Sequence, residues 1–391
     1  MENAYILSAK RTPIGSFQGA LSDVPAPQLG ATAIKSAVES AKVDINDINE
    51  VIFGQVLTAG VGQAPARQAA IYAGVPTSAA CLTINKVCGS GLKTVMLAND
   101  SIRLGESDVV VAGGQENMTL APHLLEKSRS GYRIGDFKTV DSMMKDGLWD
   151  PYNDFAMGVA AELCVKEFKF TREEQDQYTK ESYEWAIKSQ EDGLFENEIT
   201  PVEVKTRKGS VTVDKDEEPG KVRFDKIASL RPAFDKEGSI TAANASSIND
   251  GAAALVLASK KYVDTKGLKP MAKIVGHATF AQDPKWFTTA PVGAMKKVCE
   301  KTGISMEQID LFEINEAFAA VTMAAMKELS IPREKVNVHG GAVAIGHPIG
   351  GSGARIFTTL LHALKAKNKK YGMASICIGG GEAVAVIVEN L

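Results

Sequence analysis

The chain carries one short glycine pattern twice, near its two ends, and this repeat constrains the fold more than any other feature. Gly-Ser-Gly occurs at 89–91 and again at 351–353, and each copy opens a stretch with apolar residues at helical spacing. An apolar run follows each stretch, at 108–114 and at 376–381. Buried strands that alternate with amphipathic helices are typical of a parallel or mixed sheet covered on both faces. The sequence therefore predicts an α/β fold made of two similar halves that share a core.

Two cysteines and a histidine lie beside these glycine motifs. Cys88 precedes the first Gly-Ser-Gly, His347 lies in the Gly-His-Pro turn before the second, and Cys377 precedes three glycines. We expect the two cysteines to occupy matching places in the two halves, and all three side chains to converge on one cleft between them. A nucleophilic thiol, an imidazole and a second thiol in one pocket favour acyl-thioester chemistry.

One asymmetry between the halves locates an insertion. In the second half the glycine turn leads directly into the apolar strand 383–388, whereas the matching strand of the first half, 251–257, comes only after a long excursion. Long excursions beside an active edge are commonly lids or substrate-binding domains, and a solubilising appendage is the alternative. The predicted division is 1–117 plus 250–268 for the first half, 118–249 for the insertion and 269–391 for the second half.

Composition excludes several classes of function. A net charge of -3 over 391 residues gives no reason to expect a nucleic-acid or membrane-surface partner. Apolar runs fall well short of the roughly 18 residues of a membrane-spanning helix. Five cysteines without a CxxC pair argue against a zinc site and against a secreted disulfide framework. The N-terminus shows no targeting segment. We therefore expect a cytoplasmic enzyme without a bound metal.

Cys88 is the predicted nucleophile. The unpaired N–H groups and positive dipole end of the helix that follows it lower the pKa of a thiol, and the glycines allow close approach of a ligand. A buried packing cysteine is the alternative. His347, held in a rigid turn, is expected to keep Cys88 as a thiolate and to donate a hydrogen bond to a thioester oxygen. The alternative is a surface histidine or one satisfied within the core.

Cys377 and Asn315 complete the predicted site. Cys377 ends a strand before 379–381, where a turn free of Cβ atoms exposes N–H groups that can hold an oxyanion. Asn315 follows the apolar strand 311–314, at the carboxyl end where open α/β sheets place ligand contacts. A packing cysteine and a helix N-cap are the respective alternatives.

Four ordered motifs together resemble those of the thiolases. They are Asn-Lys-Val-Cys-Gly-Ser-Gly at 85–91, Asn-Glu-Ala-Phe at 315–318, Gly-His-Pro at 346–348 and Cys-Ile-Gly-Gly-Gly at 377–381. The resemblance covers essentially the whole chain and is greatest to the short-chain, biosynthetic type. It implies a five-layer αβαβα fold of duplicated α/β halves with an inserted loop domain.

The resemblance also implies the reaction, which is acetyl-CoA C-acetyltransferase activity. Two acetyl-CoA molecules would condense reversibly to acetoacetyl-CoA and CoA. Cys88 would carry the acetyl group, His347 would promote its thiolate, and Cys377 would remove a proton from the second acetyl-CoA. The enolate oxygen would be held by His347 and by a water on Asn315. The N–H groups of Cys88 and Gly379 would hold the tetrahedral intermediate.

Coenzyme A thioesters are expected as substrates, with no permanently bound cofactor and no potassium requirement. The resemblance implies a pantetheine tunnel formed by Leu148, Met157, Phe234, Ala242, Ser246, Ala317 and Phe318. Phe287 lies where a bulky residue would limit the length of the acyl chain. The candidates for contact with the CoA phosphates are Arg207, Lys208, Lys221 and Arg223, and a solvated charged loop is the alternative for each.

Other functions and the assembly remain open at this point. Ketoacyl synthases share the duplicated fold, but Cys377 stands where they carry a second histidine. A degradative 3-ketoacyl-CoA thiolase would share every catalytic residue, and Met157 with the length of the insertion favours a shorter acyl pocket. A catalytically silent acyl-CoA-binding subunit is a third reading. The resemblance implies a homotetramer, formed as a dimer of dimers, with 121–135 as the candidate tetramer loop. The expected partners are acetyl-CoA, acetoacetyl-CoA and CoA, without nucleic acid or membrane.

Overall fold

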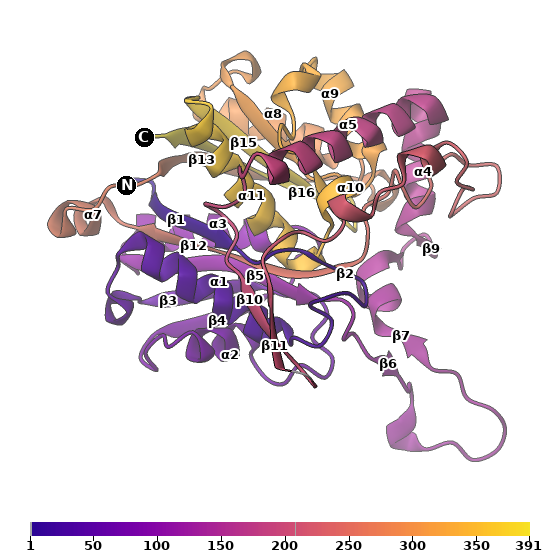
Figure 1. The fold of residues 1–391 in the computed structure, drawn as a ribbon, viewed down its shortest axis with the longest axis horizontal. Coiled ribbons are helices and arrows are strands. Elements are labelled where there is room, and N and C mark those ends of the chain that lie inside the picture. The colour runs from indigo at the N-terminus through magenta and orange to yellow at the C-terminus, as the bar shows by residue number, and fades with distance from the viewer. Residues whose placement is uncertain (1, 208) are drawn as a thin grey trace.

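A ten-stranded sheet organises the computed structural model, which describes residues 2–207 and 209–391 (Figure 1). Its first half has the strand order β4-β3-β5-β12-β1. β3 runs parallel to β4 and β5, whereas β12 runs antiparallel to β5 and β1. These strands are β1 (Tyr5–Arg11), β3 (Glu50–Gly54), β4 (Ala80–Ile84), β5 (Val109–Asn117) and β12 (Asn249–Ala258), and the short β2 (Gly15–Ser16) pairs with β12.

The second half of the sheet repeats this arrangement. Its order is β14-β15-β16-β13, with the same sequence of parallel and antiparallel pairs. A single bridge from Val336 to Phe312 takes the place of the β4–β3 pairing. Two residue pairs between β1 and β13 join the halves. The strands are β13 (Ala272–Ala281), β14 (Leu311–Ile314), β15 (Tyr371–Ile378) and β16 (Glu382–Asn390).

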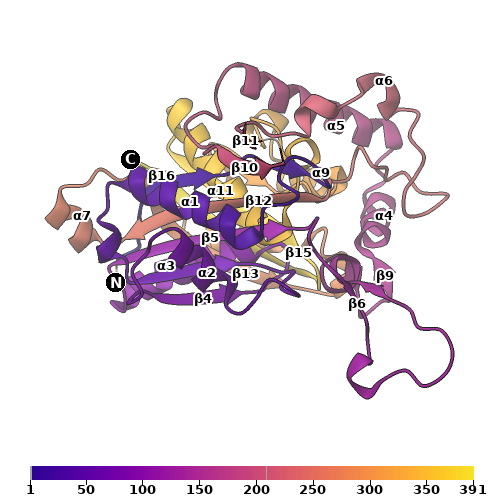
Figure 2. The same cartoon turned by 60° about the horizontal axis from the view of Figure 1, so that its bottom comes forward.

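Helices cover both faces of both half-sheets. α1 (Ala26–Ala41) and α2 (Pro65–Tyr72) pack on the outer face of the first, and α8 (Ala290–Thr302) with α9 (Ala319–Leu329) on that of the second. α3 and α11 lie between them, in a buried cluster that draws on both half-sheets (Figure 2). The middle helices are α3 (Ser90–Leu104) and α11 (Ile349–Ala366). The predicted fold class, a five-layer αβαβα arrangement of duplicated halves, is confirmed.

The repeated glycines mark the place where the two middle helices cross. A Cβ on Gly91 would lie 2.7 Å from the backbone nitrogen of Ala354, and one on Gly353 would lie 2.3 Å from that of Leu92. Only glycine permits this approach, because real Cβ atoms do not come so close to backbone. The Gly-Ser-Gly pattern is repeated since each helix presents a glycine to its counterpart.

The prediction that the two cysteines occupy matching places is wrong. Cys88 precedes α3, whereas Cys377 lies in β15, whose counterpart in the first half is β5. The glycines that follow each cysteine are similar in sequence but belong to different points of the repeat: a helix start and a strand end. The thiols approach each other from non-equivalent positions.

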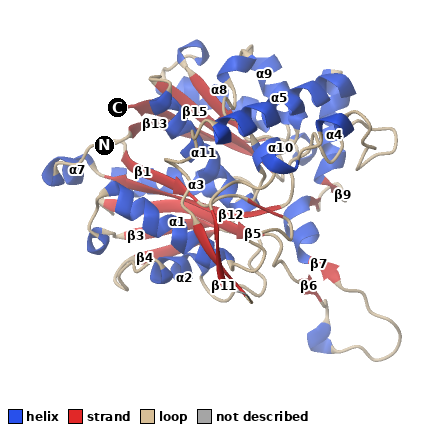
Figure 3. Ribbon diagram, viewed as in Figure 1, coloured by secondary structure: helices blue, strands red, loops and turns tan. Residues whose placement is uncertain are grey.

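The chain between β5 and β12 leaves the sheet and returns to the neighbouring strand (Figure 3). Thr171 and Glu174 form a capping box at the start of α5, because each side chain accepts a hydrogen bond from the backbone N–H of the other. The β6–β7 region extends away from the body in both views (Figures 1 and 2). The segment contains β6 (His123–Leu124), η2 (Ser128–Ser130), β7 (Val140–Asp141), η3 (Met143–Leu148), β8 (Trp149–Asp150), β9 (Phe155–Ala156), α4 (Met157–Phe168), α5 (Arg172–Glu191), β10 (Val202–Thr206), β11 (Gly209–Val213), η4 (Pro219–Lys221) and α6 (Phe224–Ile227).

Short elements complete the connections between these layers. They are η1 (Ile45–Asp47), α7 (Lys260–Lys266), η5 (Pro284–Trp286), η6 (Met306–Gln308), η7 (Arg333–Lys335) and α10 (Ala342–Ile345). Within the described residues, no helix is both long enough and apolar enough to cross a bilayer.

Candidate active site

One cavity of about 590 Å³ receives side chains from both halves and from the insertion. Cys88 comes from the turn before α3, His347 from the turn before α11, and Gly379 from the turn after β15. The cavity wall is mainly apolar and enclosed by α4 and by residues 233–248. Of the three side chains predicted to converge, Cys88 and His347 line this cavity, whereas Cys377 is not among the lining residues and Gly379, two residues later, is.

The turn that presents Cys88 has a strained backbone, and nearby hydrogen bonds stabilise it. Val87 has a φ of 45°, which β-branched residues rarely adopt. The Val87 N–H donates to Asn85 Oδ1 at 2.9 Å, and Ser90 Oγ donates to the Val87 carbonyl at 2.7 Å. A Cβ on Gly89 would lie 2.3 Å from Ile378 Cδ1, so this glycine lets the turn approach the end of β15. Strain held by such contacts is common at reactive residues.

The Cys88 thiol lies in low-polarity surroundings. Burial raises its pKa to about 12, and the N–H groups of Gly379 and of Cys88 itself act in the opposite direction. The expectation that the helix start would lower the pKa is not met in this state, because desolvation exceeds the effect of the backbone dipoles. The thiol therefore needs a base to take its proton when it reacts.

His347 is placed to be that base. Ser352 Oγ donates to the Pro348 carbonyl at 2.8 Å and lies 2.6 Å from His347 Nδ1. Since its one hydrogen is used, Ser352 accepts a hydrogen bond from Nδ1–H, and this assigns the tautomer with a lone pair on Nε2. Nε2 has no partner among the described residues. Burial lowers the pKa of His347 to about 3, and the charge of Arg355 adds to this effect.

The backbone of His347 is held by β12 of the first half-sheet. Its N–H donates to Asn249 Oδ1 at 2.9 Å, while Asn249 Nδ2 donates to the Gly15 carbonyl at 3.0 Å. Gly346 has a φ of 111°, and a Cβ there would lie 2.4 Å from the Asn249 amide. Sequence reasoning missed Asn249, which lies outside the recognised motifs, and the role of Ser352, because its Gly-Ser-Gly motif predicts a helix start and says nothing about the partner of the hydroxyl.

Cys377 and Asn315 lie behind the cavity wall. Both are 1% exposed. Cys377 belongs to the apolar cluster that includes Phe287, Ala317 and Phe318. Burial raises its pKa well above the usual range, and the nearby Cys88 adds to the rise. Neither the oxygen nor the nitrogen of the Asn315 amide has a hydrogen-bond partner among the described residues. Such a buried amide is poised to bind a small polar group.

Glu316, the glutamate of the Asn-Glu-Ala-Phe motif, has a structural role. Glu316 is fully buried and accepts hydrogen bonds from Tyr178 at 2.7 Å and Ser182 at 2.8 Å, both on α5. It also accepts from Asn337 and from the Val343 N–H. This satisfied carboxylate attaches the insertion to the second half beside Asn315.

All the residues implied for the pantetheine tunnel and for the acyl limit line the cavity. They are Leu148, Met157, Phe234, Ala242, Ser246, Phe287, Ala317 and Phe318. The rings of Phe234 and Phe287 pack edge-on against Phe318, with centroid distances of 6.0 and 6.4 Å. Phe287 is buried on this wall. Lining residues that sequence reasoning missed are Ser16, Phe17, Met118, Met144, Gly147, Ala156, Gly158, Glu218, Ala233, Ala245, Ser247, Ile248 and Ile349.

The basic residues implied for contact with the CoA phosphates differ in their position relative to the cavity. Lys221 lines the cavity and donates to Ser16 Oγ at 2.6 Å. Arg223 is exposed outside the cavity lining and pairs with Asp225 at 3.3 Å. Arg207 is exposed near the β10–β11 turn. Lys208 lies outside the described residues. Across those residues, no group of histidine, cysteine, aspartate and glutamate side chains is arranged to hold a metal ion.

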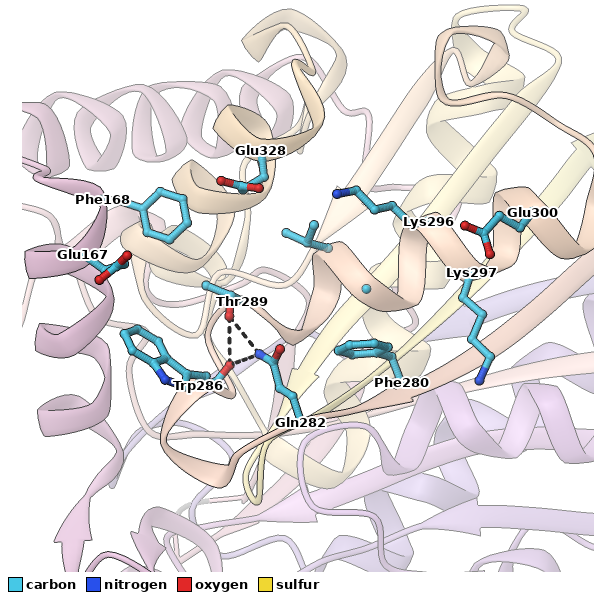
Figure 4. Close-up of a pocket in the computed structure, with 12 residues that line it drawn as sticks. Glu167, Phe168, Phe280, Gln282, Trp286, Thr289, Lys296, Lys297, Glu300 and Glu328 are labelled. Carbon is cyan, nitrogen blue, oxygen red and sulfur yellow. Dashed lines mark hydrogen bonds between the residues drawn. The ribbon is translucent and has the colours of Figure 1, made fainter.

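A second, more open cavity of about 810 Å³ is lined by Trp286 of η5 and by residues of α8 (Figure 4). Gln282 Nε2 donates to the Trp286 carbonyl and to Thr289 Oγ1, which braces this turn. Trp286 lines the second cavity, and the next residue, Phe287, lines the first. The second cavity is not lined by Cys88, His347 or Gly379.

Fold and cavity define an α/β protein with a thiol–imidazole site, and the comparisons identify its family. The chain belongs to the thiolase family, because residues 4–261 match the thiolase N-terminal domain and 268–390 the thiolase C-terminal domain.

Relatives and solved structures match over nearly the full length. The chain is 53% identical to acetyl-CoA acetyltransferase 1 of Arabidopsis thaliana, covering 98% of this chain and 93% of the relative. It is 51% identical to the acetyl-CoA acetyltransferase of Cupriavidus necator, over all of both chains. The Bacillus anthracis acetyl-CoA acetyltransferase structure matches with a TM-score of 0.98 at 43% identity, covering 100% of this chain and 99% of that chain. The Ascaris suum Acat5 thiolase, solved in complex with coenzyme A, gives 0.95 at 44% identity over all of both chains.

Proposed function

We propose that the protein is an acetyl-CoA C-acetyltransferase, which condenses two acetyl-CoA molecules to acetoacetyl-CoA and CoA and catalyses the reverse thiolysis. The observation that carries this proposal is that Cys88 and His347, whose Nε2 has no partner among the described residues, line the same apolar cavity. The full-length similarity to acetyl-CoA acetyltransferases supports it. CoA thioesters are substrates here, and no permanently bound cofactor or metal is part of the proposal.

In the first half-reaction, Cys88 attacks the thioester carbon of acetyl-CoA while His347 Nε2 takes the thiol proton. The N–H groups of Cys88 and Gly379, which act to lower the pKa of the thiol, hold the oxyanion. Cys377 gives its proton to the departing CoA thiolate. The products are acetyl-Cys88, imidazolium His347, thiolate Cys377 and free CoA.

In the second half-reaction, the Cys377 thiolate removes a proton from the methyl group of the second acetyl-CoA. The imidazolium of His347 and a water on the unpartnered Asn315 amide hold the enolate oxygen. The enolate carbon attacks acetyl-Cys88, and the Cys88 thiolate that leaves takes the proton back from His347. Every group returns to its starting state, so the cycle consumes two acetyl-CoA and releases acetoacetyl-CoA and CoA.

CoA-dependent thiolysis tests the proposal. Acetoacetyl-CoA, 3-ketohexanoyl-CoA and 3-ketodecanoyl-CoA are compared with the unmodified protein and with Cys88→Ser. The buried Phe287 at the cavity wall predicts a strong preference for acetoacetyl-CoA. Comparable cleavage of the longer substrates would instead identify a degradative 3-ketoacyl-CoA thiolase. Equal inactivity of both proteins on all substrates would identify a silent acyl-CoA-binding subunit.

We further propose a cytoplasmic homotetramer. The β6–β7 region extends from the body and exposes Tyr132, Ile134 and Phe137. Apolar side chains on a protruding segment support contact with another subunit. A relative from Gibberella zeae, 49% identical, is named cytosolic. Light scattering of the unmodified protein should give the tetramer mass, and Ile134→Asp should give a dimer. A dimeric unmodified protein would contradict the proposed assembly.

A further inference from the structure

A cavity of about 540 Å³ lies apart from the candidate active site and receives residues from all three predicted parts of the chain. β1 and α1 contribute from the first half, residues 193–197 from the insertion, and 269–271 with the end of α11 from the second half. This cavity shares no lining residue with the active-site cavity. Ile349 lines the active-site cavity and His362 lines this one, and α11 rises roughly 20 Å between them. The reaction above therefore makes no use of this space.

The fully charged side chains that line this cavity are all lysines. They are Lys10 on β1, Lys269 before β13 and Lys365 on α11. Within the described part of the chain, no carboxylate lines the cavity and none forms an ion pair with these lysines. The exposed Glu196 lies beside Gly193, where an added Cβ would be 3.0 Å from its Oε1, but it is not a lining residue. Like charges around one space repel each other, and an anion between them removes this repulsion.

Lys10 is the most constrained of the three, because it is half-buried while the other two are exposed. Its Nζ donates to the Asn197 carbonyl at 2.8 Å, which leaves two of its three N–H donors for a further acceptor. Burial lowers the pKa of Lys10, and the charge of Glu198 opposes this fall. Glu198 lies behind the cavity and is already engaged by Arg11 at 2.6 Å and by Thr359 at 3.0 Å. Lys10 is therefore a partly desolvated cation without a carboxylate partner of its own.

His362 adds a polar but uncharged group to the lining. Its Nε2 lies 3.0 Å from the Ala9 carbonyl, and since a carbonyl only accepts, Nε2 carries the proton. Burial lowers the pKa of His362, Glu198 and the bond to Ala9 oppose this fall, and the charges of Lys10 and Lys365 act with burial. The positive charge of the cavity therefore comes from its lysines.

The remaining lining residues and the donor chemistry indicate the class of ligand. A lysine ammonium directs three donors and suits a tetrahedral phosphate, whereas planar carboxylates are typically bound by the arginine fork, and no arginine lines this cavity among the described residues. Its volume lies within the range of about 300–1,000 Å³ that is typical of small-molecule sites. An apolar wall accompanies the lysines and is formed by Leu7, Ala9, Leu194, Met271 and Ala366.

We propose that this cavity binds a small organic molecule with two or more phosphate groups. The phosphates lie between Lys10, Lys269 and Lys365, and the uncharged body of the ligand packs against the apolar wall. Such a ligand contacts both halves and the insertion at once, so it stabilises the folded protein by mass action. The inference goes beyond the proposed function, because none of these residues takes part in the acyl transfer.

Calorimetric titration with ATP in metal-free buffer tests the site. CoA is present at a saturating concentration, so that the active-site cavity is filled. ATP should still bind, and Lys10→Met, Lys269→Met and Lys365→Met should each weaken its binding about tenfold. Lys261→Met is the matched control, since it removes an exposed lysine of α7 that lies outside the cavity. The control should bind ATP as the unmodified protein does. If Lys10→Met does not fold, the variants of the two exposed lysines decide.

Three further probes define the class of ligand. Inorganic tripolyphosphate carries the charge without an organic body, adenosine carries the body without phosphate, and citrate is a carboxylate anion. Each should bind at least about tenfold more weakly than ATP. Affinity of any of the three equal to that of ATP would overturn the proposed ligand class. ATP should also raise the unfolding midpoint of the unmodified protein and leave that of the Lys269→Met, Lys365→Met double variant unchanged.

The proposal is overturned by any of three results in folded protein. They are the absence of ATP binding, loss of ATP binding when CoA is present, and equal affinity in the cavity variants and in Lys261→Met. The titration needs no turnover, so its outcome does not depend on thiolysis. A protein that binds ATP at these lysines but does not cleave acetoacetyl-CoA would overturn the proposed function alone.

Discussion

At the scale of single residues, reactivity depends on a short chain of hydrogen bonds. Cys88 is half-buried and keeps its proton because desolvation raises the pKa of its thiol, and His347 is neutral because burial lowers its pKa. Two neutral groups become a nucleophile and a base only if the imidazole presents its lone pair to the thiol. Ser352 determines this orientation, since it accepts from Nδ1–H and donates to the Pro348 carbonyl. The hydroxyl of Ser352 thus supports the function of the imidazole it holds.

Replacing Ser352 by alanine should lower kcat for thiolysis by roughly 10- to 100-fold, because the imidazole loses the partner that fixes its tautomer. Stability should fall by about 1–2 kcal/mol from the unpaired N–H. Thr94→Val is the matched control, since it removes a buried hydroxyl that bonds to the Gly91 and Gly113 carbonyls. The control should lose similar stability and keep its kcat. Equal kcat losses in the two variants would contradict the assigned role of Ser352.

At the scale of elements, sequence patterns predict what is local and miss what is distant. The strands and helices of both halves follow from apolar runs and helical spacing, and the tunnel residues follow from the resemblance to the thiolases. The Asn249–His347 contact joins residues 98 positions apart, and no periodicity signals such a choice of partner. Matching glycines suggested matching cysteines, yet one glycine run begins a helix and the other ends a strand. Two glycine-rich turns of similar sequence can occupy different positions in a structural repeat, and only the fold distinguishes these positions.

The crossing of α3 and α11 should be sensitive to a single methyl group. In Gly353→Ala the new Cβ would lie 2.3 Å from the Leu92 nitrogen, which is backbone and cannot move alone. We expect a loss of about 1–3 kcal/mol in the free energy of unfolding, measured by denaturant titration. Gly220→Ala is the control, because its Cβ would meet nothing within 4 Å. A Gly353 variant as stable as the control would show that the two helices can separate without cost.

At the scale of the whole molecule, buried ion pairs join parts of the chain that the sequence separates. Arg11 on β1 is fully buried and reaches two carboxylates of the insertion, Glu198 at 2.6 Å and Asp216 at 2.7 Å. Thr359 on α11 also donates to Glu198. First half, insertion and second half therefore meet at one charged cluster. The cavity depends on this junction, because its wall is built from the same three parts.

Arg11→Met should destabilise the protein by about 3–5 kcal/mol, since it leaves two buried carboxylates without their partner. If the insertion is anchored mainly here, denaturation should resolve into two transitions, with proteolysis first within residues 118–248. Lys260→Met removes an exposed pair with Asp264 on α7 and should cost less than about 1 kcal/mol. A single cooperative transition in the Arg11 variant would mean that the contacts of Glu316 with Tyr178 and Ser182 suffice to hold the insertion. In that case the contacts in the second half of the fold, beside Asn315, would determine the order of unfolding, and those at β1 would not.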